Sequence, residues 1–220
     1  MLNPPFKIRY IYYWKDINNY TKLIIILTLS LYISFRGCFS LRKYTYRYPN
    51  GIRIPFLSEG SVELLAEVIR ENIQEKTVII CIGTDRCIGD ALGPMVGTFL
   101  QNNSFRLPLY GTLEAPIHAV NLEQSISNIK TIHPNAFIIA IDACIGAEDN
   151  IGNIHIKNGP VYPGKGVGKK LPGVGDISIV GIVDKINQED CYAIHNVRLS
   201  LVMKMARVIS DAIELAALLS

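Results

Sequence analysis

Several common signals are scarce or absent in this chain of 220 residues. An apolar run at residues 23–35 is too short to span a bilayer, which takes about 20 residues. Residues 1–50 carry eight Lys or Arg and one Asp, so a net charge of +3 leaves the rest of the chain acidic. Because nucleic-acid binding needs Lys and Arg clustered on the folded body, no nucleic-acid partner is expected. The sequence contains no internal repeat, so a repeat fold is not expected.

Metal-binding and disulfide patterns are also missing. The five cysteines are odd in number and show no CxxC spacing, which argues against a disulfide framework or a structural zinc site. No HxxxH, HxH or clustered Cys/His spacing is present. Cys81 and Cys144 are expected to be buried thiols in a reducing compartment. Cys87 has no histidine near it in sequence, so a nucleophilic role is not predicted.

The first 48 residues differ in composition from the rest. They are basic and apolar, and three interpretations stay open for residues 23–35: a surface anchor, a poor signal sequence, or an extension from a misassigned start codon. Membrane contact is expected only if that run is an anchor. We therefore expect residues 1–48 to lie outside the fold and residues 49–220 to form one domain.

Buried strands alternate with amphipathic helices in the remaining sequence. Continuous apolar runs predict strands buried on both faces, and helices are predicted where apolar residues recur at helical spacing. Ser58 or Ser61 is a candidate cap of the first helix. This alternation predicts an α/β protein, a three-layer α/β/α sandwich around a mainly parallel sheet. The expected strands are residues 77–82, 109–112, 137–141, 153–157 (an edge strand) and 177–183, and the expected helices are residues 62–69, 90–100, 119–131 and 196–219.

A glycine-rich segment, residues 83–90, follows the first buried strand and opens a helix. This is the usual place for a phosphate-binding loop, but neither G-x-G-x-x-G nor G-x-x-x-x-G-K-[ST] is present. The carboxylates of Asp85 and Asp90 would also repel a phosphate. Asp90 is therefore either the N-cap of the helix or a catalytic carboxylate.

A second aspartate, Asp142, directly follows the apolar run 137–141. Burial and a neighbouring carboxylate would both raise its pKa, so that it can donate a proton while its partner stays ionised. The alternative is an Asp that accepts hydrogen bonds from the next turn. Because carboxyl ends of parallel strands share one edge, Asp90 and Asp142 are the predicted acid/base pair.

Supporting candidates are Asp85, Glu114 and His118, the last two after the short strand 109–112. His118 is alternatively a helix-capping residue. The segment 158–176, rich in Gly, Pro and Lys, is either a lid or peptide-binding loop whose lysines hold an acidic substrate, or a solvated surface loop. Asp176 precedes a strand, so it lies at the amino end and away from the chemistry unless that strand runs antiparallel. The remaining histidines, His133, His155 and His195, are expected to be structural or solvated.

Five segments carry a resemblance to a known family: residues 79–97 (IICIGTDRCIGDALGPMVG), 110–122 (YGTLEAPIHAVNL), 135–146, 171–183 (LPGVGDISIVGIV) and 198–206. They resemble the YyaC family of sporulation proteins, and the resemblance covers about residues 48–220. That family is grouped with the germination protease of spore-forming bacteria and, more distantly, with hydrogenase maturation proteases. The resemblance implies a phosphorylase/hydrolase-like fold and a cytoplasmic location in the developing spore.

The resemblance also implies a reaction. The catalytic candidates of germination protease, an Asp in a D-A-L-G-P segment and an Asp in an I-D-A segment, correspond to Asp90 and Asp142. In hydrogenase maturation proteases the corresponding acids hold nickel together with a downstream His. That His would fall near residues 174–176, where this chain has none. No cofactor is therefore expected, although a metal at the Asp pair stays open.

The expected function is an endopeptidase that uses the Asp pair to activate water, with a protein or peptide as substrate. By resemblance, its substrates are small spore proteins. Two alternatives stay open: a non-catalytic binding or regulatory protein on the same fold, and a metal-dependent maturation peptidase.

Overall fold

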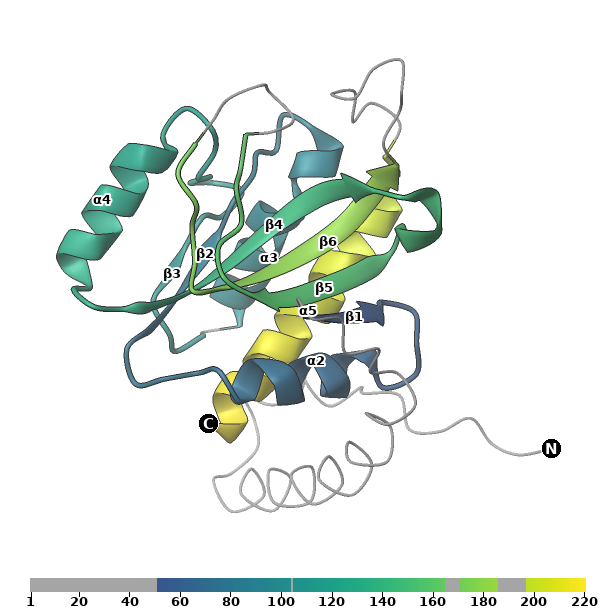
Figure 1. The fold of residues 1–220 in the computed structure, drawn as a ribbon, viewed down its shortest axis with the longest axis horizontal. Helices are drawn as coiled ribbons and strands as arrows, with labels where there is room; N and C mark the ends of the chain where they lie inside the picture. The colour runs from purple at the N-terminus through teal and green to yellow at the C-terminus, as the bar shows by residue number, and fades with distance from the viewer. Residues whose placement is uncertain (1–50, 104, 165–170, 186–196) are drawn as a thin grey trace.

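The computed structural model describes residues 51–103, 105–164, 171–185 and 197–220 (Figure 1). These residues form a six-stranded mixed sheet in the order β1-β5-β6-β4-β2-β3. Strands β3, β2, β4 and β6 are parallel, whereas β5 runs antiparallel to both β6 and β1. The strands are β1 (Ile52–Pro55), β2 (Thr77–Cys81), β3 (Leu109–Tyr110), β4 (Phe137–Gly146), β5 (Asn153–Asn158) and β6 (Ile177–Lys185).

Helices cover both faces of this sheet, which confirms the predicted α/β class. Helices α2 (Ser61–Arg70), α3 (Leu92–Asn102) and α5 (Leu199–Leu219) pack on one face, and α4 (Leu122–Ile132) packs on the other (Figure 1). Two single turns of 3-10 helix, η2 (Ile88–Asp90) and η3 (Glu148–Asn150), complete the elements. Within the described residues, no helix combines the length and apolar character needed to cross a membrane.

Hydrophobic burial explains why these elements assemble. The first cluster joins the three-helix face to alternate residues of the central strands, such as Ile79, Ile141 and Ile179. The second, smaller cluster lies under α4 and contains Ile80 and Ala140, the neighbours of those residues along the chain. Strands β2 and β4 thus bury both faces, as their continuous apolar runs predict.

Two expectations about these elements are wrong: the position of one strand in the sheet and the residue that caps the first helix. Residues 153–157 were expected at the edge of the sheet, but β5 lies between β1 and β6. Neither Ser58 nor Ser61 caps α2, because Gly60 occupies the N-cap without a side-chain hydrogen bond. Ser58 and Ser61 instead donate hydrogen bonds to the Pro55 and Phe56 carbonyls, at 2.7 and 3.1 Å.

The segment 158–176 is more regular than a loop in its described parts. The backbones of Val161 and Val174 exchange two hydrogen bonds, both of 2.9 Å, so two arms run side by side. Both valines are buried in the cluster under α4. The tip, residues 165–170, lies outside the described residues, as do the three lysines predicted to hold an acidic substrate.

Candidate functional site

Asp142 lies level with the end of β2. Cys81 pairs with Ile141, and the Ile82 amide donates a 2.7 Å hydrogen bond to the Ile141 carbonyl. The strand was expected to stop at Ile141, but β4 continues to Gly146, and Asp142 pairs with Val180 of β6. The long pairing with β6 holds Asp142 inside the sheet, so its side chain stands rigidly on the face that carries α4.

The glycine-rich segment brings Asp90 back to this strand end. The Thr84 amide donates a 3.0 Å hydrogen bond to the Asp90 carbonyl, and the Asp90 amide donates one of 3.0 Å to the Cys87 carbonyl. Gly83 has φ of 138°, and a Cβ there would lie 2.0 Å from the Asp90 carbonyl oxygen. A side chain at position 83 would therefore push Asp90 away, so the glycine serves close packing.

Asp90 is not the side-chain cap of the following helix. Ala91 occupies the N-cap of α3, where no side-chain capping bond is present, and Asp90 ends η2. The Met95 amide donates its helical hydrogen bond to the Ala91 carbonyl, at 3.0 Å. The capping interpretation of Asp90 is therefore wrong, which leaves its carboxyl group without a role in starting the helix.

Burial controls the protonation of both carboxyl groups. Asp142 is 6% exposed, and its pKa is raised well above the usual value by burial first and by the negative charge of Asp90 second. The Ala143 amide donates a 2.8 Å hydrogen bond to Asp142 Oδ1, which opposes this shift without cancelling it. Burial raises the pKa of Asp90 to about 6, opposed by a hydrogen bond from the Thr84 backbone.

Burial therefore favours the protonated form of both carboxyl groups. Asp90 titrates close to the physiological range, and the negative charge of Asp90 favours the protonated form of Asp142 further. Two carboxyl groups that interact electrostatically do not ionise together, so one can serve as a base while the other serves as an acid. Because they are coupled, their titrations belong to the pair as a whole.

The two acidic supporting candidates lie at the surface. Asp85 is exposed and accepts a 3.5 Å hydrogen bond from Thr84 Oγ1. Glu114 is exposed and accepts a 3.4 Å hydrogen bond from Thr98 Oγ1. Both carboxylates lie outside the buried pair, so we assign them no part in the chemistry of Asp90 and Asp142.

His118 reaches the same edge of the sheet but makes local contacts. The preceding residue, Ile117, bridges to Ile82 and accepts a 2.8 Å hydrogen bond from the Gly83 amide. The His118 amide donates to Asn121 Oδ1 at 2.8 Å, and the Val120 amide donates to the ring Nδ1 at 3.3 Å. With Nδ1 accepting, the proton of the neutral ring is assigned to Nε2. His118 thus shapes the entry to α4.

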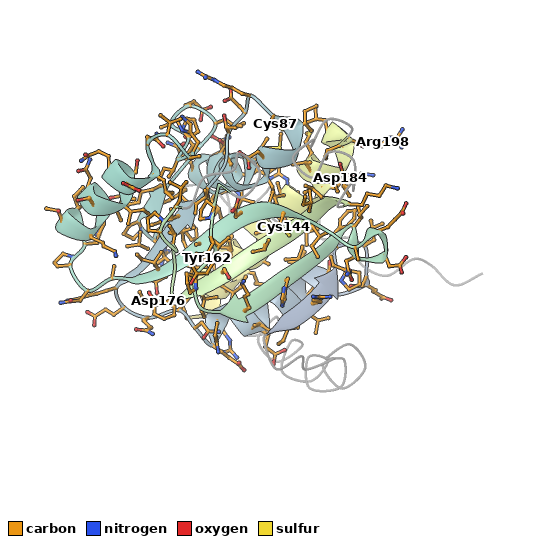
Figure 2. All side chains as sticks on the ribbon, turned by 45° about the horizontal axis from the view of Figure 1, so that its top comes forward. Cys87, Cys144, Tyr162, Asp176, Asp184 and Arg198 are labelled. Atoms are coloured by element: carbon orange, nitrogen blue, oxygen red, sulfur yellow. The ribbon has the colours of Figure 1, made fainter. Side chains whose placement is uncertain are left out.

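The thiols near the pair are poor nucleophiles. Cys81 is fully buried, and burial raises its pKa strongly. Burial and the neighbouring Asp142 raise the pKa of Cys144 to about 11. Figure 2 shows Cys144 on β4, with Asp176 and Asp184 near the two ends of β6. Both thiols are protonated at neutral pH, which keeps them unreactive.

The described residues do not complete a nickel site of the maturation-protease kind. The position where a histidine would be needed lies at the start of β6, where the Asp176 amide donates to the Ile138 carbonyl at 2.8 Å. Ile138 precedes Asp142 by four strand residues, or about 13 Å. The Asp176 side chain itself accepts a 2.8 Å hydrogen bond from the Ile138 amide. Among the described residues, no three His, Cys, Asp or Glu side chains gather as a metal site, and His195 lies outside them.

The sequence did not predict a row of paired residues that crosses the sheet from Arg53 to Asp142, on the same face as the Asp142 side chain. Strand β1 was not predicted, so the position of Arg53 was unknown. Arg53 pairs with His155, His155 with Val180, and Val180 with Asp142, across four neighbouring strands. The alternation of residues 153–157 was the available signal, because it places His155 and Lys157 on one face of β5.

Comparisons with known proteins place the chain in a family. Residues 57–212 match the family described as "Protein of unknown function (DUF1256)". The chain is also 43% identical over 153 residues to the "Uncharacterized protein YyaC" of Bacillus subtilis (strain 168), a match that covers 69% of this chain and 75% of that protein. The residues that match the family, 57–212, contain the whole glycine-rich segment and all of β4.

Proposed function

We propose that this chain, which belongs to the DUF1256 family, is an endopeptidase that hydrolyses peptide bonds with Asp90 and Asp142. The observation that carries the proposal is the electrostatic coupling of two carboxyl groups, both with raised pKa values, at the place where strand β2 ends. The resemblance to germination protease supplies the reaction class. It also suggests small spore proteins as substrates and the interior of the developing spore as the location.

Burial assigns the two roles, because Asp142 is buried whereas Asp90 is only partly buried. Protonated Asp142 donates a hydrogen bond to the scissile carbonyl oxygen, which stabilises the negative charge that develops there. Ionised Asp90 accepts a proton from a water molecule as that water attacks the carbonyl carbon. When the tetrahedral intermediate collapses, the C–N bond breaks and Asp90 returns the proton to the departing amine.

This assignment predicts a bell-shaped dependence of the cleavage rate on pH. Activity rises as Asp90 ionises, around pH 6, because the base must be deprotonated. Activity falls again at higher pH as Asp142 loses its proton, because burial and the negative charge of Asp90 raise the pKa of Asp142. The two limbs report the pair rather than either residue alone.

A peptide-library experiment tests the proposal. The full chain is incubated with a mixture of synthetic peptides, and new termini are detected by mass spectrometry. Asp90→Asn and Asp142→Asn should each lower the cleavage rate by about 10²- to 10⁴-fold. Asp85→Asn is the matched control, because it removes an exposed carboxylate from the same segment as Asp90, and it should cleave at the parental rate.

Two results would contradict the proposal. Equal cleavage by the parent and both pair variants would show that the acids do no chemistry. No cleavage by the parent across pH 4–9 would favour a binding protein that keeps the fold, the alternative of a different class.

A further inference from the structure

A cavity of about 370 Å³ lies between the last turn of α4 and the start of β4. Its lining residues all come from the stretch 129–138, which contains the turn that joins these two elements (Figure 1). Ile138, at the β4 side of the cavity, precedes Asp142 by four strand residues, or about 13 Å. The cavity is therefore separate from the carboxyl pair, and no step of the proposed peptidase reaction uses it.

The floor of this cavity is apolar. Ile129 of α4 and Ile138 of β4 are 3% and 6% exposed, and both belong to the buried cluster under α4. Ala136, in the turn between them, is partly buried and packs against the same cluster. A floor of this kind favours the apolar part of a small molecule, because binding removes apolar surface from water on both sides.

The rim of the cavity carries a positive charge. Lys130 is exposed, and its ammonium group makes no ion pair within the described residues. The described lining contains this one cation and neither Asp nor Glu. Asn135, also on the rim, has a left-handed φ of 60°, which Asn tolerates better than most residues. The charge of the lining therefore favours an anionic group over a cationic one.

His133 adds a hydrogen-bonding group whose position is fixed. The Tyr110 hydroxyl lies 2.8 Å from His133 Nε2, and the two rings meet edge to face with centroids 5.7 Å apart. The His133 amide donates a 2.8 Å hydrogen bond to the Ile129 carbonyl, and the Ala136 amide donates one of 3.2 Å to the His133 carbonyl. With the hydroxyl donating to Nε2, the ring proton is assigned to Nδ1, which is then a donor. A cavity held in this way needs little ordering when a ligand binds.

We propose that this cavity is a second binding site, which takes a small organic carboxylate with an apolar body. The apolar body lies on the floor, and the carboxylate at the rim accepts hydrogen bonds from Lys130 and His133. The volume sets the class of ligand, because about 370 Å³ falls in the range of sites for small molecules, about 300–1,000 Å³. The ligand is not a substrate of the Asp pair, so this inference stands or falls independently of the peptidase function.

Nuclear magnetic resonance of the full-length protein tests this site. The probes are para-ethylbenzoate and para-ethylbenzamide, which share an apolar body and differ in charge. In ¹⁵N-labelled protein, the benzoate should shift the backbone amide signals of residues 129–138, with a dissociation constant in the low millimolar range that suits a probe of about ten non-hydrogen atoms. The benzamide should bind about three- to fivefold more weakly, because it offers no charge to Lys130.

Three variants separate the cavity from general charge effects. Lys130→Gln should weaken benzoate binding about three- to fivefold and leave benzamide binding unchanged. Lys204→Gln is the matched control, since it removes the same charge from an exposed position on α5, on the other side of the sheet, and it should change neither affinity. Ala136→Leu fills the cavity and should abolish binding of both probes, with circular dichroism to check that the variant is folded.

The outcomes decide between this site and unspecific binding. A preference for the benzoate that Lys130→Gln removes and Lys204→Gln keeps supports the site, whether or not any peptide is cleaved. Equal affinity of the parent for the two probes, or equal losses in the two Lys variants, would overturn the carboxylate assignment. Shifts confined to residues outside 129–138, or no shift with about 20 mM probe, would overturn the site itself.

Discussion

The two faces of the sheet differ most clearly along β4. Its residues Ile139 and Ile141 enter the cluster formed with α2, α3 and α5, while Ala140, Asp142 and Cys144 point to the other face. The first face is closed by three helices and is almost wholly apolar. The second is apolar under α4 and becomes polar towards β5 and β1. One strand thus contributes to stability with one set of side chains and to the candidate site with the alternate set.

The largest expected effect comes from moving a polar group from one face to the other. Ile141→Asn places an unpaired amide in the three-helix face, where Ile141 is 0% exposed. It should reduce the free energy of unfolding by more than about 4 kcal/mol, because the amide loses water without gaining partners. Urea unfolding followed by circular dichroism measures the change.

The adjacent residue provides the control for that comparison. Asp142→Asn puts the same amide on the other face, where it replaces a polar group of the same shape, and it should not be destabilising at pH 7. If both variants unfold at the same urea concentration, the two faces do not differ as described.

A smaller change in the free energy of unfolding, a gain instead of a loss, is expected for Asp90→Asn. Because burial raises the pKa of Asp90 to about 6, the stability that its protonated form provides is present below pH 4 and is lost as pH rises through 6. Asp90→Asn should therefore be more stable than the parent by about 1–3 kcal/mol at pH 8 and equal to it at pH 4. Thermal unfolding across this pH range checks the prediction, and a gain that is independent of pH would contradict it.

The smallest effect is expected where α4 begins. The Asn121 side chain accepts a hydrogen bond from the His118 amide and donates one of 3.0 Å to the Pro116 carbonyl. Asn121→Ala removes both and should cost about 1–2 kcal/mol. Asn128→Ala, at an exposed position on the same helix, should cost almost nothing. Equal unfolding midpoints for the two variants would show that this turn is not held by Asn121.

Much of the central fold could be predicted because burial leaves a local signature. Continuous apolar runs marked β2 and β4, and helical spacing of apolar residues marked α5. Strand β1 could not be found in this way. Its four residues, IRIP, combine a charge with a proline, and their strand conformation depends on pairing with β5, about a hundred residues away.

The candidate site was only partly predictable for the same reason. Asp90 and Asp142 stood out because each follows an apolar run, but the choice between cap and carboxyl pair for Asp90 needed the position of Ala91. The row that joins residues 53, 155, 180 and 142 depends on the register of three strand pairs. No local pattern contains that register, so only the folded sheet brings Arg53 and His155 into line with Asp142.

The coupling between the two carboxyl groups is the central claim, and the pKa of Asp142 tests it most directly. In protein labelled with ¹³C at the Asp carboxyl carbons, NMR titration reports the protonation of Asp142 in the parent and in Asp90→Asn. We expect the pKa of Asp142 to lie well above the usual range in the parent and to fall in Asp90→Asn, because a neighbouring negative charge is removed. An identical titration of Asp142 in both proteins would contradict the account, since the two groups would then not form one site.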